Sequence, residues 1–189
     1  MKNTVLDYAL KIRLPLTLFV IVISFMLTFY ISRAERDSVG YAPVQPIQFS
    51  HKLHAGTMSI DCQYCHTGVT KGRAALVPSV NICMNCHTIA RKDRPEIIKL
   101  TTYYKEGKPI PWKRVHKVPE YAYFNHSVHV NKGIQCETCH GNVKAMDVIK
   151  QVKSFTMTAC LDCHREPQKF LPYLTNVKKG PENCFACHR

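Results

Sequence analysis

The longest apolar segment of the chain lies near its N-terminus. Leu14–Ile31 is an 18-residue run without a charged side chain, and a helix of that length spans about 27 Å, close to the hydrocarbon thickness of a bilayer. Lys2, Lys11 and Arg13 precede the run. The charges that follow it cancel: Arg33, Glu35, Arg36 and Asp37. The positive-inside rule therefore predicts a single-pass anchor in a bacterial inner membrane, with a cytoplasmic N-terminus and the rest of the chain in the periplasm.

A cleaved signal sequence is the competing interpretation of this segment. Ser32-Arg33-Ala34 carries small residues in the positions of a cleavage site. The apolar run is longer than the core of a usual signal sequence, which favours a retained anchor. We therefore predict residues 1–13 as the cytoplasmic N-terminus, 14–32 as the transmembrane anchor and 33–48 as a linker.

Beyond the anchor the hydrophobic pattern is weak. It contains no sustained alternation typical of strands and few long helical runs. A short helix is predicted from Pro95, with Ile97, Ile98, Leu100, Thr101 and Tyr104 on one packed face. Lys108–Pro119 contains three prolines and is expected to be extended. The pattern predicts an N-terminal transmembrane α-helix followed by a small, mostly α and irregular domain with little β structure.

All ten cysteines of the chain fall into five copies of one motif, Cys-x-x-Cys-His. In this motif two thiols form thioethers with the vinyl groups of one porphyrin, and the adjacent histidine binds the iron as proximal ligand. The cysteine pairs are Cys62 and Cys65, Cys83 and Cys86, Cys136 and Cys139, Cys160 and Cys163, and Cys184 and Cys187. The proximal histidines are His66, His87, His140, His164 and His188. The motifs predict five covalently attached haem c groups and a domain whose core is largely porphyrin.

Other cysteine chemistries fit this spacing poorly. A zinc ribbon does not require a histidine after each second cysteine. A thioredoxin-like Cys-x-x-Cys does not occur five times in one chain, and a disulfide scaffold does not demand uniform spacing.

Five further histidines match the five predicted irons in number: His51, His54, His116, His126 and His129. This count predicts two histidine ligands on every iron. The segment Phe49-Ser-His51-Lys-Leu-His54 recurs as Phe124-Asn-His126-Ser-Val-His129, and histidines three residues apart lie on one face of a helical turn. His116 stands alone as a distal ligand. Met157, three residues before Cys160, is its alternative.

The chain contains an internal duplication. The F-x-H-x-x-H element and the two haem motifs after it recur at offsets of 75, 74 and 77 residues. Residues 49–123 form the first two-haem unit with a connector, 124–180 the second unit, and 181–189 the fifth-haem tail.

The formal charge of +13 changes this picture little. Ten propionates on five haems offset most of the surplus, and charge-assisted hydrogen bonds to them use Lys and Arg. The sequence has no signature of a nucleic-acid-binding fold, so no nucleic-acid partner is predicted.

The chain resembles the pentahaem cytochrome subunit of alternative complex III, a bacterial quinol:electron-acceptor oxidoreductase. The resemblance rests on the anchor, the two F-x-H-x-x-H elements, the segment from Trp112 to His126 and the order of the five motifs. The F-x-H-x-x-H element itself is similar to that of class III cytochromes, in which the first histidine ligates the haem that follows and the second ligates another. The resemblance implies an iron–sulfur subunit, polytopic quinol-binding subunits and a monohaem cytochrome as partners.

Two other functions were considered. A self-contained membrane quinol dehydrogenase feeding a periplasmic reductase usually has a methionine two residues after a motif histidine. Here those positions hold Gly68, Ile89, Asn142 and Glu166. A multihaem enzyme needs an iron with an open position, which the balance of histidines argues against. We therefore expect an electron-transfer subunit without a substrate-converting site of its own.

Overall fold

The computed structural model describes residues 4–188 and divides the chain into two compact units, Met1–Ser38 and Val39–Arg189. Within it, the side chains of Val5, Leu6 and residues 32–37 are not described. Lys2 and the charged side chains that follow the apolar run therefore lie outside the described residues. The predicted orientation of the anchor depends on them and stays a prediction.

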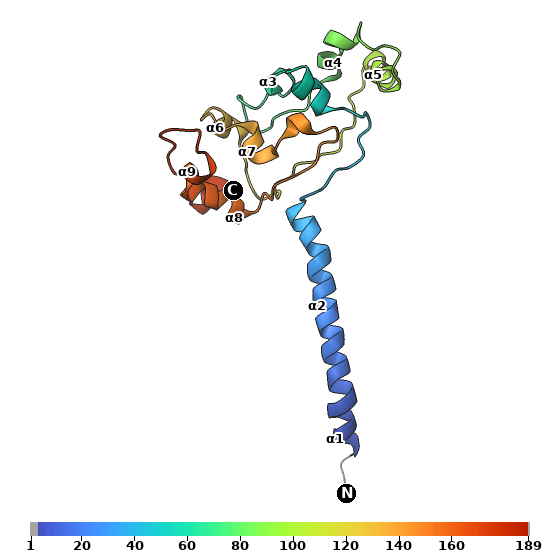
Figure 1. The fold of residues 1–189 in the computed structure, drawn as a ribbon, viewed down its shortest axis with the longest axis vertical. Helices are drawn as coiled ribbons and strands as arrows, with labels where there is room; N and C mark the ends of the chain where they lie inside the picture. Colours follow the sequence, from blue (N-terminus) through green and yellow to red (C-terminus); the bar gives the residue numbers. More distant parts are fainter. Residues whose placement is uncertain (1–3, 189) are drawn as a thin grey trace. The chain divides into compact units, whose positions relative to one another are not determined.

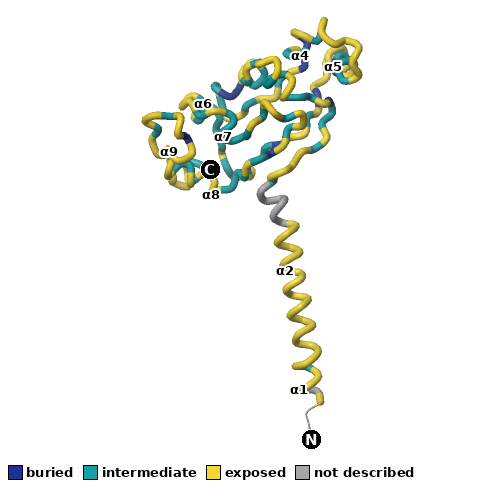
Figure 2. The backbone as a smooth tube through the Cα atoms, viewed as in Figure 1, coloured by how far each residue is buried: buried dark blue, intermediate teal, exposed yellow. Residues whose placement is uncertain are grey.

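The N-terminal unit is a continuous helix (Figure 1). It comprises α1 (Thr4–Tyr8), the π-helical turn η1 (Ala9–Arg13) and α2 (Leu14–Asp37). The segment Ala9–Ile31 is long and apolar enough to cross a membrane, with a mean hydropathy of 2.3 and none of its span buried by the rest of the protein. The predicted apolar N-terminal helix is confirmed, and Figure 2 shows its exposed surface.

The second unit consists of short helices joined by irregular segments, and residues 4–188 contain no β-strand. The predicted fold class is confirmed. The helices are η2 (Lys52–Thr57), α3 (Cys62–Cys65), α4 (Val80–His87), α5 (Pro95–Lys105), α6 (His126–Val130), α7 (Cys136–His140), η3 (Val143–Ala145), α8 (Met157–Arg165), α9 (Pro167–Phe170) and α10 (Cys184–Cys187).

The helix predicted from Pro95 is present as α5, with proline in its first turn. Leu100 is buried, but Ile98 and Tyr104 are 55% and 46% exposed. The packed face is therefore narrower than the sequence predicted. The proline-containing segment after α5 has no regular secondary structure over residues 108–119.

The apolar cluster of the second unit lies around α4 and α5. Ile47, Val80, Met84, Leu100 and Ile110 are its buried members. Cys83, Ile97, Tyr103 and Trp112 pack against it. Trp112 thus contributes to an apolar cluster. Buried positions are otherwise sparse along the tube of the second unit (Figure 2), as expected where cofactors supply the core.

Candidate haem-binding site

Each Cys-x-x-Cys pair lies on a short helical turn, which brings residues three apart to one face. Side chains that precede these turns cap them: Asp61 accepts a hydrogen bond from the Gln63 amide at 2.7 Å, and Asn183 accepts one from the Ala186 amide at 2.9 Å. None of the ten cysteines is paired in a disulfide. The sequence therefore folds each pair into the paired-thiol arrangement that attachment to a porphyrin edge requires.

Four of the five motif histidines direct Nδ1 at a backbone carbonyl oxygen. The acceptors are Leu76 for His66 at 2.7 Å, Ala90 for His87 at 3.0 Å, Pro181 for His164 at 2.7 Å and Tyr121 for His188 at 2.9 Å. A carbonyl can only accept, so the proton stands on Nδ1 and the lone pair on Nε2. This tautomer presents Nε2 to a metal and fixes the ring orientation.

Three of the predicted distal histidines face a motif histidine. The ring centroids are 6.2 Å apart for His54 and His87, 6.5 Å for His126 and His140, and 6.2 Å for His129 and His164. With metal–nitrogen bonds of about 2 Å to each imidazole, two rings on opposite sides of one metal have centroids roughly 6 Å apart. These three pairs therefore fit axial ligation of one iron each.

The two F-x-H-x-x-H elements repeat the same ring geometry. Phe49 lies edge-on to His51 at 4.9 Å and stacks on His54 at 4.4 Å. Phe124 lies edge-on to His126 at 4.8 Å and stacks on His129 at 4.6 Å. In both elements the phenylalanine ring contacts both imidazoles, edge-on to the first and stacked on the second. The two imidazoles therefore have the same relative orientation in the two elements.

The second histidine of each element bonds to a carbonyl four residues earlier. His54 Nδ1 donates to the Ser50 oxygen at 2.9 Å, and His129 Nδ1 donates to the Asn125 oxygen at 2.7 Å. The first histidines differ, because His126 Nδ1 donates to the Arg73 oxygen at 2.6 Å while His51 Nδ1 is buried without a hydrogen-bond partner.

His51 and His116 lie among other imidazoles. Burial, followed by the nearby His66, His54 and His116, lowers the pKa of His51 to about 4. The His116 ring lies edge-on to His140 with centroids 4.3 Å apart, too close for opposite sides of one iron. Its Nε2 is buried without a hydrogen-bond partner.

The methionines that were alternatives to His116 differ in their surroundings. Met157 begins α8 with its side chain 65% exposed, whereas Met84 is packed in the apolar cluster. The assignment of distal ligands to the first and fifth irons therefore stays a prediction.

Burial favours the neutral forms of His140 and of the Cys136 thiol. It lowers the pKa of His140 to about 4, with further contributions from His116, His126 and His66. It raises the pKa of the Cys136 thiol to about 11, with Cys62 as the next cause. Neutral imidazole is the metal-binding form of histidine.

The five motifs follow one another in space in an order that differs from the sequence. The second motif contacts the first, because Asn85 donates a hydrogen bond to the Tyr64 hydroxyl at 3.0 Å. The first and third motifs border one hollow of about 360 Å³, lined by residues that include Cys62 and Cys136.

The third motif is tied to the segment that follows the fourth, since the Tyr173 hydroxyl accepts from the Gln135 amide at 3.1 Å and lies 2.8 Å from Thr138 Oγ1. The fourth and fifth motifs are joined by Arg165 and Glu182 at 2.9 Å. Figure 1 agrees, with α4 at one end of this unit, α3 and α7 between, and α8 and the C-terminus at the other end. The order is second, first, third, fourth, fifth.

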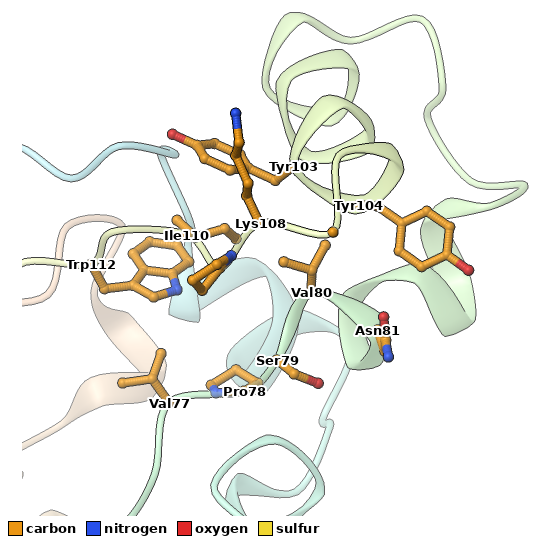
Figure 3. A pocket seen from close by; sticks show the side chains of 12 residues that line it. Val77, Pro78, Ser79, Val80, Asn81, Tyr103, Tyr104, Lys108, Ile110 and Trp112 are labelled. Carbon is orange, nitrogen blue, oxygen red and sulfur yellow. The ribbon is translucent and has the colours of Figure 1, made fainter.

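A separate cavity of about 600 Å³ adjoins the end that carries the second motif (Figure 3). Residues 77–81, which lead into that motif, form one wall, and Tyr103, Lys108 and Trp112 contribute to the other. None of the motif cysteines or histidines lines it. The cavity is therefore distinct from the places where the haems attach.

Sequence reasoning missed the groups that hold the imidazoles. The carbonyls of Arg73, Leu76 and Ala90 carry no sequence signal, because every residue has one. Gly180 was missed as well. A Cβ at Gly180 would overlap the His164 ring, and the Gly180 amide donates to the His164 oxygen at 2.9 Å, so this glycine lets the chain lie directly against the imidazole.

Two family models match the chain, one on each half. The model described as class III cytochrome C family matches residues 29–110, and the model described as cytochrome c7 and related cytochrome c matches residues 122–189. With the paired thiols and the facing imidazoles, these matches make each half of the chain similar to class III and c7-like multihaem cytochromes c, a type that carries covalently bound haem c.

Two curated proteins of Nitratidesulfovibrio vulgaris strain Hildenborough are similar to the chain. The menaquinone reductase multiheme cytochrome c subunit is 28% identical over 168 residues, covering 77% of this chain and 77% of that protein. The high-molecular-weight cytochrome c is 30% identical over 142 residues, covering 68% of this chain but only 25% of that protein.

Proposed function

We propose that this chain is a membrane-anchored pentahaem cytochrome that transfers electrons in the periplasm. The observation that carries the proposal is the spatial order of the five attachment motifs, in which each motif is linked to the next by a hydrogen bond, an ion pair or a shared hollow. Bound haem c supplies one-electron redox chemistry at each motif. The chain's own contribution is to fix the order of the groups and to orient their ligands through the Nδ1 hydrogen bonds.

The ligand roles follow from this arrangement. All ten motif cysteines hold porphyrins, and His66, His87, His140, His164 and His188 are the proximal ligands. His54, His126 and His129 are the distal ligands opposite His87, His140 and His164, and His51 serves the first motif. His116, with its orphaned Nε2, completes the set as the fifth distal histidine, and Met157 is the alternative.

The wider setting we propose is a membrane complex of the alternative complex III type. The N-terminal helix is the anchor, with a cytoplasmic N-terminus and a periplasmic haem domain. Iron–sulfur and polytopic quinol-oxidising subunits deliver electrons, and a monohaem cytochrome, a soluble carrier or a terminal oxidase accepts them. The similarity to a subunit of a menaquinone reductase supports a quinone-linked complex.

The same similarity favours a second candidate, in which electrons run toward quinone. The name of that relative, a menaquinone reductase subunit, describes quinone reduction. Haem redox chemistry is reversible, so the direction depends on the potentials of the partners and not on the order of the motifs.

Purification of the native complex from membranes in mild detergent tests the proposal. We expect this cytochrome to carry five covalent haems by intact mass and to co-purify with an iron–sulfur subunit and polytopic membrane subunits. Two assays decide the direction of electron flow. If added quinol reduces the haems, electrons run from quinol to the cytochrome; if the reduced complex reduces added quinone, they run toward quinone. If the cytochrome purified alone, or with a nitrite- or nitrate-reducing partner, the proposed membrane complex would be contradicted. A self-contained quinol dehydrogenase would then be favoured.

A further inference from the structure

The distal histidine of the third motif is held by a backbone carbonyl of the first half. The Arg73 oxygen accepts a hydrogen bond from His126 Nδ1 at 2.6 Å and another from the His126 amide at 3.3 Å. The His126 ring is nearly parallel to the His140 ring, with 5° between the planes, whereas the His54 and His87 rings are inclined by 60°. The direction of the Arg73 carbonyl therefore controls the angle between the two imidazoles of the third motif.

Arg73 lies in a segment without regular secondary structure, residues 72–79. Its side chain is exposed, but the guanidinium lies over the ring of Tyr123, with Cζ 4.4 Å from the ring centroid. A cation over an aromatic face is attracted by the electron density of the ring. The cation–π contact therefore restrains the residue whose carbonyl orients His126.

Tyr123 is itself anchored to the fifth motif. Its amide donates to the Cys187 oxygen at 2.7 Å. Two residues earlier, the Tyr121 oxygen accepts from His188 Nδ1 at 2.9 Å, and the Tyr121 ring stacks on that imidazole with the centroids 5.8 Å apart. These contacts fix the backbone from which the Tyr123 ring reaches Arg73.

We propose that Tyr123 is a positioning residue for the third haem and acts through Arg73. The Tyr123 ring holds the guanidinium, the Arg73 carbonyl holds Nδ1 of His126, and the fifth motif holds the backbone of Tyr123. The orientation and basicity of the distal imidazole therefore depend on a side chain that does not coordinate the iron. This proposal rests on the proposed function, in which His126 ligates the third iron.

Electron paramagnetic resonance of the oxidised, full-length and haem-loaded protein tests the role of Tyr123. The anisotropy of a low-spin signal from iron with two imidazoles depends on the angle between the ring planes, and its largest g value rises as parallel rings become inclined. Tyr123→Leu removes the aromatic face but keeps an apolar side chain and the backbone amide. We expect this variant to raise the largest g value of the third haem and to leave the other haems unchanged. Tyr123→Phe keeps the ring and should retain the wild-type signal.

Tyr104→Leu is the matched control. Tyr104 and Tyr123 are 46% and 36% exposed, but Tyr104 lies in α5 and makes no ring contact with the residues that the structure describes. An unchanged signal of the third haem in Tyr123→Leu would overturn the proposal. An equal shift in Tyr104→Leu or in Tyr123→Phe would overturn it as well.

A redox titration followed by the same signal gives a second measurement. A weaker Nδ1 hydrogen bond makes the imidazole less basic and a poorer donor to oxidised iron, so the midpoint potential of the third haem should rise in Tyr123→Leu. A competing role for Arg73 is pairing with a haem propionate. In that case Arg73→Gln would lower the potential, because a nearby positive charge is lost, and Tyr123→Leu would leave it unchanged. That outcome would contradict the positioning role.

His126→Ala identifies the signal of the third haem and separates the two possible failures. If this variant leaves every low-spin signal in place, His126 is not an axial ligand and the ligand assignment of the proposed function fails. If it removes one signal, and Tyr123→Leu does not shift that signal, only the positioning role of Tyr123 fails.

Discussion

The two F-x-H-x-x-H elements share their ring geometry but are supported differently. Around His51 and His54 the backbone forms the π-helical turn η2, in which the Lys52 amide donates to the Met146 oxygen at 2.9 Å. Around His126 and His129 it forms α6, capped by Asn125. The second element lies on the first half, since the Ser127 amide donates to the Gly72 oxygen at 3.1 Å.

The two elements thus share their ring geometry and the Nδ1 hydrogen bond of the second histidine, but they differ in the support of the first histidine. The phenylalanine-to-imidazole distances agree within a few tenths of an ångström between the copies, as given above. The Nδ1 partner of the first histidine does not persist, because His126 uses the Arg73 carbonyl whereas His51 has none. Since outer hydrogen bonds tune ligand basicity, equivalent haems of the two units are expected to differ in potential.

The largest expected effect comes from removing the second histidine of each element. His54→Ala should convert the second haem, and His129→Ala the fourth, from low spin to high spin, because each change removes one axial ligand. Electron paramagnetic resonance of the oxidised protein measures this. Identical spectra for the two variants and the wild type would contradict both ligand pairs.

Alanine substitutions at two closely packed glycines, one in each unit, should have the next largest effect on the protein. A Cβ at Gly56 would overlap the Lys144 carbonyl oxygen, and one at Gly180 would overlap the His164 ring. Each alanine substitution should destabilise the protein by about 1–3 kcal/mol, and only Gly180→Ala should alter the spectrum of a haem. Gly72→Ala is the control, since a Cβ there meets nothing within 4 Å. A stable Gly180→Ala protein with an unchanged spectrum would refute the role of this glycine.

Loss of the equivalent caps should have a smaller effect. Ser50 Oγ accepts from the Leu53 amide at 3.1 Å, and Asn125 Oδ1 accepts from the Ser127 amide at 3.0 Å. Replacement of either by alanine should lower the free energy of unfolding by about 1 kcal/mol. Ser79→Ala is the control, because the Ser79 side chain makes no capping bond to α4. Thermal unfolding compares the three variants, and equal midpoints would refute the caps.

The smallest expected effect is a pH dependence of stability that arises at the first F-x-H-x-x-H element and not at the second. Hydrogen bonds from Ser50 and Lys52 hold the pKa of Asp147 below its usual value. Because the folded pKa is lowered, the contact stabilises the protein above the unfolded pKa near 3.8 and is lost as pH falls through the folded value. The free energies of unfolding of the wild type and of Asp147→Asn should differ at neutral pH and converge as the pH falls to the acidic end of the range. A constant difference across that range would contradict the prediction.

The sequence predicted the motifs, the helical turns around them and the apolar N-terminal helix, because each depends on local spacing. It also paired His126 with the motif that follows, through the resemblance to class III cytochromes. It could not predict the carbonyl partners of Nδ1 or the contact between Tyr64 and Asn85, since these depend on how distant segments meet. Nor could it predict that Trp112 packs against the apolar cluster, because an aromatic residue fits an aliphatic core and a porphyrin face equally well.

The docking of the second ligand element on residues 70–73 has a consequence for how the protein is made. His126 and Asn131 both bond to carbonyls in that segment, of Arg73 and Thr70. The segment that supports His126 is therefore translated before His126 itself. An evolutionary or engineered excision of the first half would leave the second without its support, so the repeat cannot be trimmed to a freestanding two-haem module.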